Sequence, residues 1–271
     1  MDQSSIEAAK ARTARVFGEL AADYDQGGPA FFTYFGRRLV ELADIAPDSR
    51  VLDVATGRGA VLFPSAAKVG AGGSVIGIDL TEAMVQALTV DIERRAVTNA
   101  DVRTMDAENL AFVGDSFDAV LCGFGVMFFP RLAVALSEFR RVLTTGGMLA
   151  VSTFKTLPPT PAIAPIMNAF QHTSQRPLTQ ELSTPDELRG ALEQAGFHDV
   201  SIHLERFEAV HADEDAYWSW AMSLLPGVWY RAQPTDTQTR FKEDVYEHLS
   251  SIRQSDGIHE SITANFALAR K

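Results

Sequence analysis

The chain has 271 residues, of which 46% are hydrophobic and 22% charged, and its formal net charge is −11. It contains no apolar run of about 18 residues, which excludes a membrane-spanning helix, and residues 1–15 lack the apolar core of a secretory signal. The acidic balance opposes binding to polyanions, so nucleic acid is not an expected partner. The single cysteine, Cys122, excludes an internal disulfide and fits a cytoplasmic protein.

The first 46 residues are predicted to form a helical cap. Residues 6–24 place apolar side chains at mostly helical spacings, and the sequence Asp-Gln-Gly-Gly-Pro at 25–29 breaks this helix. A second helix is expected over about 31–43, and it leads into the first strand. We expect the whole chain, 1–271, to form a single domain.

Strands and helices alternate through the middle of the chain. Strands are expected over 51–54, 74–79, 101–104, 117–122 and 147–154, and helices over 59–69, 82–95 and 131–143. Alternation at this pitch is typical of a doubly wound α/β fold, in which helices cover both faces of a mostly parallel sheet.

A proline-rich segment, 157–161, ends the regular pattern because proline cannot continue a central strand. A polar stretch then runs to Ser183, after which Thr184, Pro185 and Glu187 predict the start of a helix that stops at Gly196. The remaining expected elements are a strand over 197–210, helices over about 213–224 and 235–254, and an alternating final strand over 261–269.

The most informative segment is 51–59, Val-Leu-Asp-Val-Ala-Thr-Gly-Arg-Gly. Its first residues are typical of a buried strand, and Gly57 and Gly59 allow a tight turn whose backbone N–H groups approach a ligand closely. The next strand ends in Asp79, where a carboxylate can hold the two hydroxyls of a ribose. The segment therefore predicts a site for a nucleoside-bearing cofactor.

The class of cofactor follows from Asp53 and from a missing glycine. A dinucleotide-binding loop has a third glycine, and the corresponding position here is Leu62. The carboxylate of Asp53 would repel a pyrophosphate, whereas it suits the ammonium and sulfonium of a methionine-like tail. An NAD(P)-dependent oxidoreductase is therefore the weaker alternative. A generic α/β crossover, in which the glycines only form a tight turn, also stays open.

Five segments, in this order, resemble the class I S-adenosylmethionine (SAM) dependent methyltransferases, in particular the small-molecule branch that includes the ubiquinone and menaquinone C-methyltransferases. These segments are 51–59, 77–80, 105–108, 116–120 and 141–147. The resemblance implies a seven-stranded Rossmann-like sheet whose last strand inserts antiparallel beside the fifth. It also implies a core of 47–210 and 259–271, with 211–258 inserted before the last strand as a helical substrate cover.

The same resemblance implies SAM as the cofactor. Displacement of a methyl group from a sulfonium requires no metal, and the sequence has no His, Asp and Glu cluster at metal-binding spacing, so no metal is expected. The resemblance assigns Asp53 to the methionine end, Asp79 to the ribose, and Asp106 with Ala107 to the edge of the adenine. Met84 lies against the adenine face or packs in the core, two roles that the sequence does not separate. The predicted cofactor set is Tyr24, Asp53, Ala55 (where many members have glycine), Thr56, Gly57, Gly59, Asp79, Leu80, Met84, Asp106, Ala107, Cys122 and Phe124.

The acceptor side is predicted from aromatic residues near two edges of the fold. Tyr24 is similar to the N-terminal ring that related enzymes close over the sulfonium, where cation–π attraction contributes about 0.5–2 kcal/mol. Its alternative role is packing on the sheet. Phe32, Phe128, Trp218 and Met222 are predicted to contact an apolar acceptor, with core packing as the alternative for each.

Two histidines on or just after the sixth strand, His203 and His211, are candidate general bases, and Tyr24 is the third candidate catalytic residue. A carbon acceptor needs no general base. The sequence thus predicts a SAM-dependent methyltransferase that acts on carbon or oxygen of an apolar small molecule, such as an aromatic quinone precursor or a secondary metabolite. A non-catalytic SAM-binding protein is the alternative outside the enzymes. The acceptor's identity, and whether the chain works as a homo-oligomer, stay open.

Overall fold

A computed structural model describes residues 2–24, 28–155, 160–170 and 182–271. The breaks predicted at 25–29 and 157–161, and the polar stretch before Ser183, fall wholly or partly outside these residues. Within the described ranges no helix is both long and apolar enough to cross a membrane.

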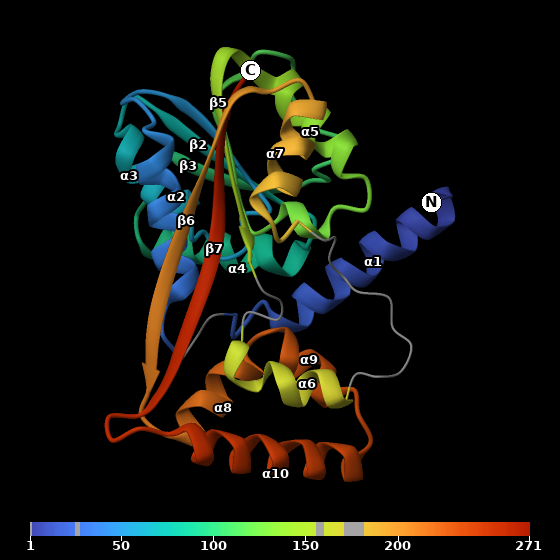
Figure 1. The fold of residues 1–271 in the computed structure, drawn as a ribbon. Helices are drawn as coiled ribbons and strands as arrows, with labels where there is room; N and C mark the ends of the chain where they lie inside the picture. The colour runs from blue at the N-terminus through green and yellow to red at the C-terminus, as the bar shows by residue number, and fades with distance from the viewer. Residues whose placement is uncertain (1, 25–27, 156–159, 171–181) are drawn as a thin grey trace.

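The centre of the molecule is a seven-stranded sheet with the order β3-β2-β1-β4-β5-β7-β6 (Figure 1). The first five strands are parallel, and β7 runs antiparallel to both β5 and β6. This confirms the predicted doubly wound sheet with an antiparallel last strand. The strands are β1 Arg50–Val54, β2 Ser74–Asp79, β3 Ala100–Thr104, β4 Phe117–Gly123, β5 Leu143–Phe154, β6 His198–His211 and β7 Ile258–Arg270.

Helices cover both faces of this sheet, with α2 and α3 on one side and α5 and α7 on the other (Figure 1). The described helices are α1 Gln3–Leu20, α2 Phe31–Ala43, α3 Leu62–Val69, α4 Glu82–Arg94, α5 Leu132–Val142, α6 Ala164–Phe170, α7 Pro185–Gln194, α8 Glu214–Met222, α9 Leu225–Arg231 and α10 Thr235–Ile252, with 3-10 turns at Val126–Phe128 and Pro161–Ile163. The predicted start of α7 is present, because Thr184 Oγ1 accepts from Glu187 N and the Glu187 carboxylate accepts from Thr184 N.

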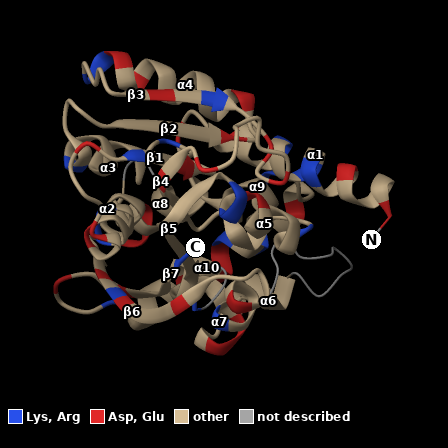
Figure 2. Cartoon of the chain, turned by 90° about the horizontal axis from the view of Figure 1, so that it is seen from above, with Lys and Arg blue, Asp and Glu red and all other residues tan. Residues whose placement is uncertain are grey.

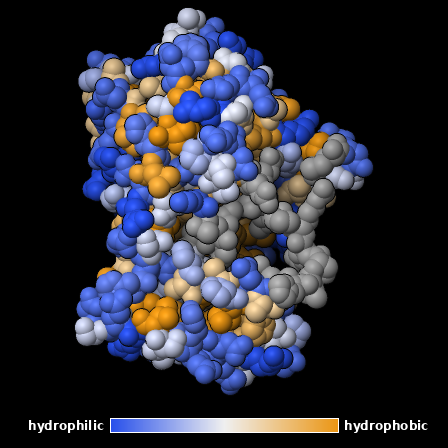
Figure 3. Space-filling view, in the orientation of Figure 1, coloured by the Kyte–Doolittle hydropathy of each residue, from blue (hydrophilic) through white to orange (hydrophobic). Residues whose placement is uncertain are grey.

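A second group of helices, α6, α8, α9 and α10, gathers beyond one end of the sheet (Figure 1). The long strands β6 and β7 extend from the sheet to this group, whose interior contains the fully buried Tyr217, Trp220 and Phe241. Between the two parts the molecular surface is hollowed (Figure 3). The sequence did not indicate α6 and α9, since each has only seven residues and too few turns to show a helical period.

Two helix ends differ from their predicted positions next to the site. The first helix ends at Leu20 rather than Tyr24, so Tyr24 lies in the turn that follows α1. The third helix begins at Leu62 rather than 59, because Gly57 and Gly59 adopt φ values of +51° and +81°. Those left-handed conformations cannot continue a right-handed helix, and they create a loop between β1 and α3.

Candidate active site

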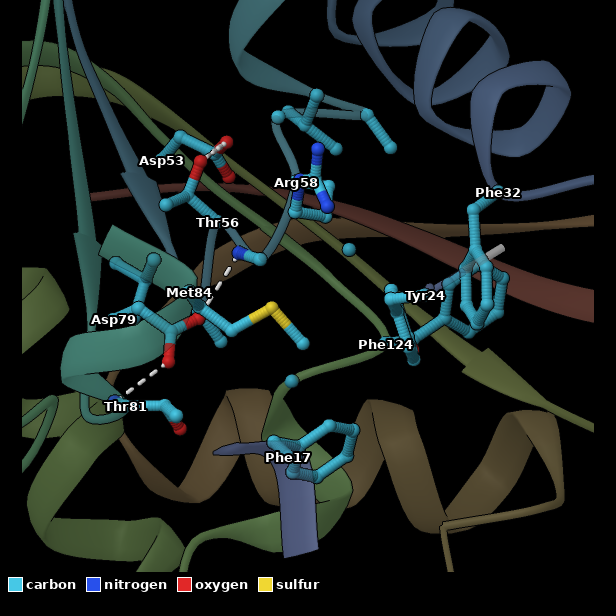
Figure 4. A pocket seen from close by; sticks show the side chains of 18 of the residues that line it. Phe17, Tyr24, Phe32, Asp53, Thr56, Arg58, Asp79, Thr81, Met84 and Phe124 are labelled. Atoms are coloured by element: carbon cyan, nitrogen blue, oxygen red, sulfur yellow. Dashed lines mark hydrogen bonds between the residues drawn. The ribbon is translucent and has the colours of Figure 1, made fainter. Parts of the chain in front are cut away.

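A cavity of about 690 Å³ opens at the carboxyl ends of β1, β2 and β4. This is the edge of a doubly wound sheet where ligands bind. Fourteen of the residues predicted from the sequence line it: Tyr24, Phe32, Asp53, Ala55, Thr56, Gly57, Gly59, Asp79, Leu80, Met84, Asp106, Ala107, Phe124 and Phe128. Figure 4 shows carboxylates on one side of this space and aromatic rings on the other.

Asp79 organises the glycine-rich loop from the end of β2. Its Oδ2 accepts from Gly57 N at 3.0 Å, and its Oδ1 accepts from Thr81 N at 2.8 Å (Figure 4). Burial raises the pKa of Asp79, and the two N–H groups oppose that rise. Each carboxylate oxygen has a second lone pair, so Asp79 can hold the loop and still accept from the hydroxyl groups of a ligand.

Asp53 is almost wholly buried at the base of the cavity. Its Oδ2 accepts from Thr56 Oγ1 at 2.6 Å, while its Oδ1 is buried without a hydrogen-bond partner. Burial raises the pKa of Asp53 to about 7, because the bond from Thr56 offsets only part of the desolvation penalty and the Asp79 carboxylate adds repulsion. A buried acceptor that lacks a donor suits a cationic ligand group at this point.

Two residues that are not glycine have left-handed backbones at the cavity wall. Ala55 follows β1 with φ +55°, and Phe124 follows β4 with φ +59°. The chain is tightly packed at Gly125, next to Phe124: a Cβ on Gly125 would lie 2.5 Å from Ala55 Cβ and 2.7 Å from Cys122 Sγ. Cys122 is therefore fully buried behind this wall and does not line the cavity, although it was predicted in the cofactor set. Strained backbone of this kind is concentrated at ligand sites.

The far side of the cavity is built from stacked aromatic rings. Tyr24 stacks on Phe32 with ring centroids 5.0 Å apart, and Phe124 stacks on Phe154 at 4.0 Å. Phe17, from α1, contacts Tyr24 edge-on at 6.0 Å (Figure 4). These rings come from α1 and the turn after it, from α2, and from the ends of β4 and β5, so they form a continuous apolar wall opposite the carboxylates.

Helix α1 is tied to the loop after β3 through Lys10. Its ammonium lies 2.6 Å from Asp106 Oδ2 and 2.5 Å from Glu108 Oε2, and Glu108 also accepts from Arg131 Nε at 2.8 Å. These two cations lower the pKa of Glu108 against the effect of burial. Lys10, Phe17, Arg58 and Phe154 all line the cavity, and none of them was predicted from the sequence.

Four predicted acceptor-side residues do not line the cavity. The His203 side chain lies on the exposed surface of β6. His211 is buried among Tyr217 and Trp220, each with ring centroids 4.8 Å from its own, and burial lowers its pKa to about 4.

In the second helix group, Trp218 packs on Tyr230 and Phe241, and Met222 packs against the apolar core. The geometry therefore supports neither histidine as a base, nor Trp218 and Met222 as direct contacts of the acceptor. No group of three or more His, Cys, Asp or Glu side chains with metal-binding geometry occurs among the described residues.

Comparison with known proteins gives the family. Residues 51–147 match the family model described as a methyltransferase domain. The nocamycin O-methyltransferase of Saccharothrix syringae is 35% identical over 77% of this chain and 81% of its own length. The ubiquinone/menaquinone biosynthesis C-methyltransferase UbiE of Ectopseudomonas mendocina is 30% identical over 71% of this chain and 83% of its own.

A solved structure agrees with these matches at the level of the fold. The YcgJ protein of Bacillus subtilis superimposes with a TM-score of 0.62 at 19% identity, covering 88% of this chain and 98% of that one. Together with the glycine-rich loop at 57–59 and the carboxylates of Asp53 and Asp79 beside it, the sequence matches decide against an oxidoreductase. The chain belongs to the family of SAM-dependent methyltransferases.

Proposed function

We propose that this enzyme methylates oxygen or carbon of an apolar, ring-bearing small molecule, of the kind found among quinone precursors and secondary metabolites. The observation that carries the proposal is the aromatic wall of Tyr24, Phe32, Phe124 and Phe154, which shares one cavity with the donor-side carboxylates. Flat rings stack favourably on such a wall. The similar O- and C-methyltransferases named above support both acceptor atoms.

The donor side fits SAM, which when bound supplies a methyl group on a sulfonium that is a good leaving group. The unpartnered Oδ1 of Asp53 suits its ammonium, and the free lone pairs of Asp79 suit its ribose hydroxyls. At Gly57 no atom lies within 4 Å of the position a Cβ would take, so the backbone there leaves open space for the ligand. Asp106, Ala107 and Met84 complete the proposed adenine end of the site.

The acceptor side orients its ligand and excludes water rather than moving a proton through histidine. No histidine among the described residues lines the cavity, so we propose that the acceptor brings its own nucleophile, such as an ionised oxygen or an electron-rich carbon. Residues 1–46 form the proposed cap, and residues 211–258 the proposed cover. Leu224 and Leu225 of this cover line the cavity.

The proposed acceptor class excludes nucleic acid. The net charge of −11 opposes polyanions, and along the ribbon in Figure 2 Lys and Arg are interspersed with Asp and Glu. Transfer of labelled methyl from SAM should be measured with three panels: aromatic acids, phenols and enols; aliphatic amines; and oligonucleotides. We expect turnover in the first panel. Turnover confined to amines or oligonucleotides would reject the proposal.

Donor affinity should depend on pH through Asp53. The cationic donor favours the ionised carboxylate of Asp53. Because the pKa of Asp53 is about 7 in the free protein, binding below that pH must first remove the carboxyl proton. Affinity for S-adenosylhomocysteine, which keeps the ammonium, should therefore fall as the pH falls below 7. The slope should approach about tenfold per pH unit by pH 5. Isothermal titration calorimetry between pH 5 and 7.5 measures this slope.

The control for this slope uses a carboxylate outside the cavity. Asp101 is exposed and pairs with Arg103, so Asp101→Asn should keep the wild-type pH dependence. Asp53→Asn should bind more weakly at pH 7.5 and show a shallower profile, in which the remaining pH dependence comes from Asp79, whose pKa burial also raises. A wild-type slope in Asp53→Asn would show that another group controls donor binding.

Tyr24 should affect turnover more than donor affinity. Its ring belongs to the acceptor wall, stacked on Phe32, and it contacts Phe17. Tyr24→Ala should lower kcat by about tenfold or more, because positioning and water exclusion suffer, while affinity for S-adenosylhomocysteine changes by less than about threefold. Tyr24→Phe keeps the ring and should retain most of the turnover. Unchanged kcat in Tyr24→Ala would remove Tyr24 from the acceptor site.

A further inference from the structure

The end of α1 is held by an arginine from the cofactor loop. Arg58 lies between Gly57 and Gly59, and its Nη1 donates to Ala21 O at 2.6 Å and to Ala22 O at 3.2 Å. These carbonyls follow the last turn of α1, where the helix itself supplies no N–H partner. The guanidinium thus caps α1 from a different part of the chain, 36 or 37 residues away.

The other edge of the same guanidinium is fixed by Asp91 of α4. Arg58 Nε and Nη2 both donate to Asp91 Oδ2, at 3.0 and 2.6 Å. The Arg58 side chain is 19% exposed and that of Asp91 only 7%, so this pair is largely shielded from water. A planar fork with five donors can serve a carboxylate and two carbonyls at once, which a lysine ammonium cannot do in the same geometry.

This arrangement joins the two halves of the cavity. On one side of Arg58, Gly57 N donates to Asp79, so the loop conformation depends on the donor-side carboxylate. On the other side, the carbonyls that it caps stand two or three residues before Tyr24 and four or five after Phe17. Figure 4 shows Arg58 projecting from the loop between the carboxylates and the aromatic rings.

We propose that Arg58 is a positioning residue that transmits occupancy of the donor loop to the end of α1, and so holds Phe17 and Tyr24 against the acceptor. This inference rests on the proposed function only for the role of the two rings. The link itself concerns the donor loop and α1, and it can be measured with no acceptor present.

The test is hydrogen exchange of backbone amides in residues 18–24, with and without saturating S-adenosylhomocysteine. In the wild type, the ligand should slow this exchange by about fivefold or more, because it orders the loop that holds the turn. In Arg58→Ala the ligand should still bind, but the slowing should be lost. Arg58→Lys should behave like Arg58→Ala, and it also serves if the alanine variant does not fold.

The matched control is Arg94→Ala. Arg94 pairs with the other oxygen of Asp91, Oδ1, at 2.8 Å, and it also lines the cavity, but among the described residues it makes no hydrogen bond or ion pair with α1. This variant should keep the ligand-induced slowing. The proposal is overturned if either Arg58 variant keeps the slowing, if Arg94→Ala loses it, or if both Arg58 variants fail to bind the ligand. The acceptor panels test the proposed function, and their outcome does not depend on this exchange measurement, so the two proposals can fail separately.

Discussion

Replacing Asp79 with alanine should weaken SAM binding by about 50- to 1000-fold, which corresponds to about 2–4 kcal/mol. Two losses add in this variant. The ribose hydroxyls lose a charged acceptor, and Gly57 N in the loop and Thr81 N before α4 lose the acceptor to which they are bonded at 3.0 and 2.8 Å. The second loss makes the expected effect larger than for removal of a single ligand contact.

Asparagine should not rescue this position. Both carboxylate oxygens of Asp79 accept from backbone N–H groups, so an amide would direct its own NH₂ at one of these donors. Calorimetric titration with SAM should therefore give similar, weak affinities for Asp79→Asn and Asp79→Ala. The exposed Asp101 serves as control, since Asp101→Ala removes a carboxylate that does not line the cavity. Wild-type affinity in Asp79→Ala would remove Asp79 from the donor site.

The donor side of the cavity could be predicted from the sequence because strand ends determine it. In a parallel sheet the carboxyl ends of neighbouring strands lie at one edge, so residues just after β1, β2 and β3 must meet there. Asp53, Gly57 and Asp79 follow this rule, Asp106 after β3 was assigned by the family resemblance, and all four line the cavity. The same alternation of elements predicted a mostly parallel sheet with helices on both faces, while the short helices α6 and α9 carried no periodic signal.

The acceptor side could not be predicted in the same way because distant segments build it. Phe17 and Lys10 reach the cavity only because α1 packs across it, and no local pattern reports that contact. His203 and His211 lie on or at the end of the expected strand, but the side chain of one faces solvent and that of the other packs against α8.

The sequence around Arg58 carries a signal of its own. Arg58 is a long charged side chain between two glycines, in a loop that must approach a ligand. Such a side chain either contacts the ligand or leaves the loop to bind elsewhere, and the structure shows it bonded to Asp91 and to the end of α1. An arginine between two glycines of a ligand-binding loop is therefore a candidate positioning residue from its sequence context alone.

Gly57→Val should abolish SAM binding while the protein stays folded. The glycine has φ +51°, a conformation that costs a β-branched residue about 1–2 kcal/mol. No atom lies within 4 Å of the position of the new Cβ, so the variant meets no clash in the free protein. Gly57 lines the cavity together with Asp79, so we expect the valine methyls to take up space that the donor needs.

Two other glycines separate backbone strain from loss of the cavity. Gly146 has φ +75° and equally open surroundings but does not line the cavity, so Gly146→Val should lose stability and keep wild-type SAM affinity. At Gly59 a Cβ would lie 2.7 Å from Phe63 and 2.8 Å from Leu88, so Gly59→Val should lose both stability and binding. Thermal unfolding and equilibrium dialysis with SAM distinguish the three variants. Normal binding by Gly57→Val would mean that the donor does not approach the backbone of this loop, because a valine there would otherwise stand in its place.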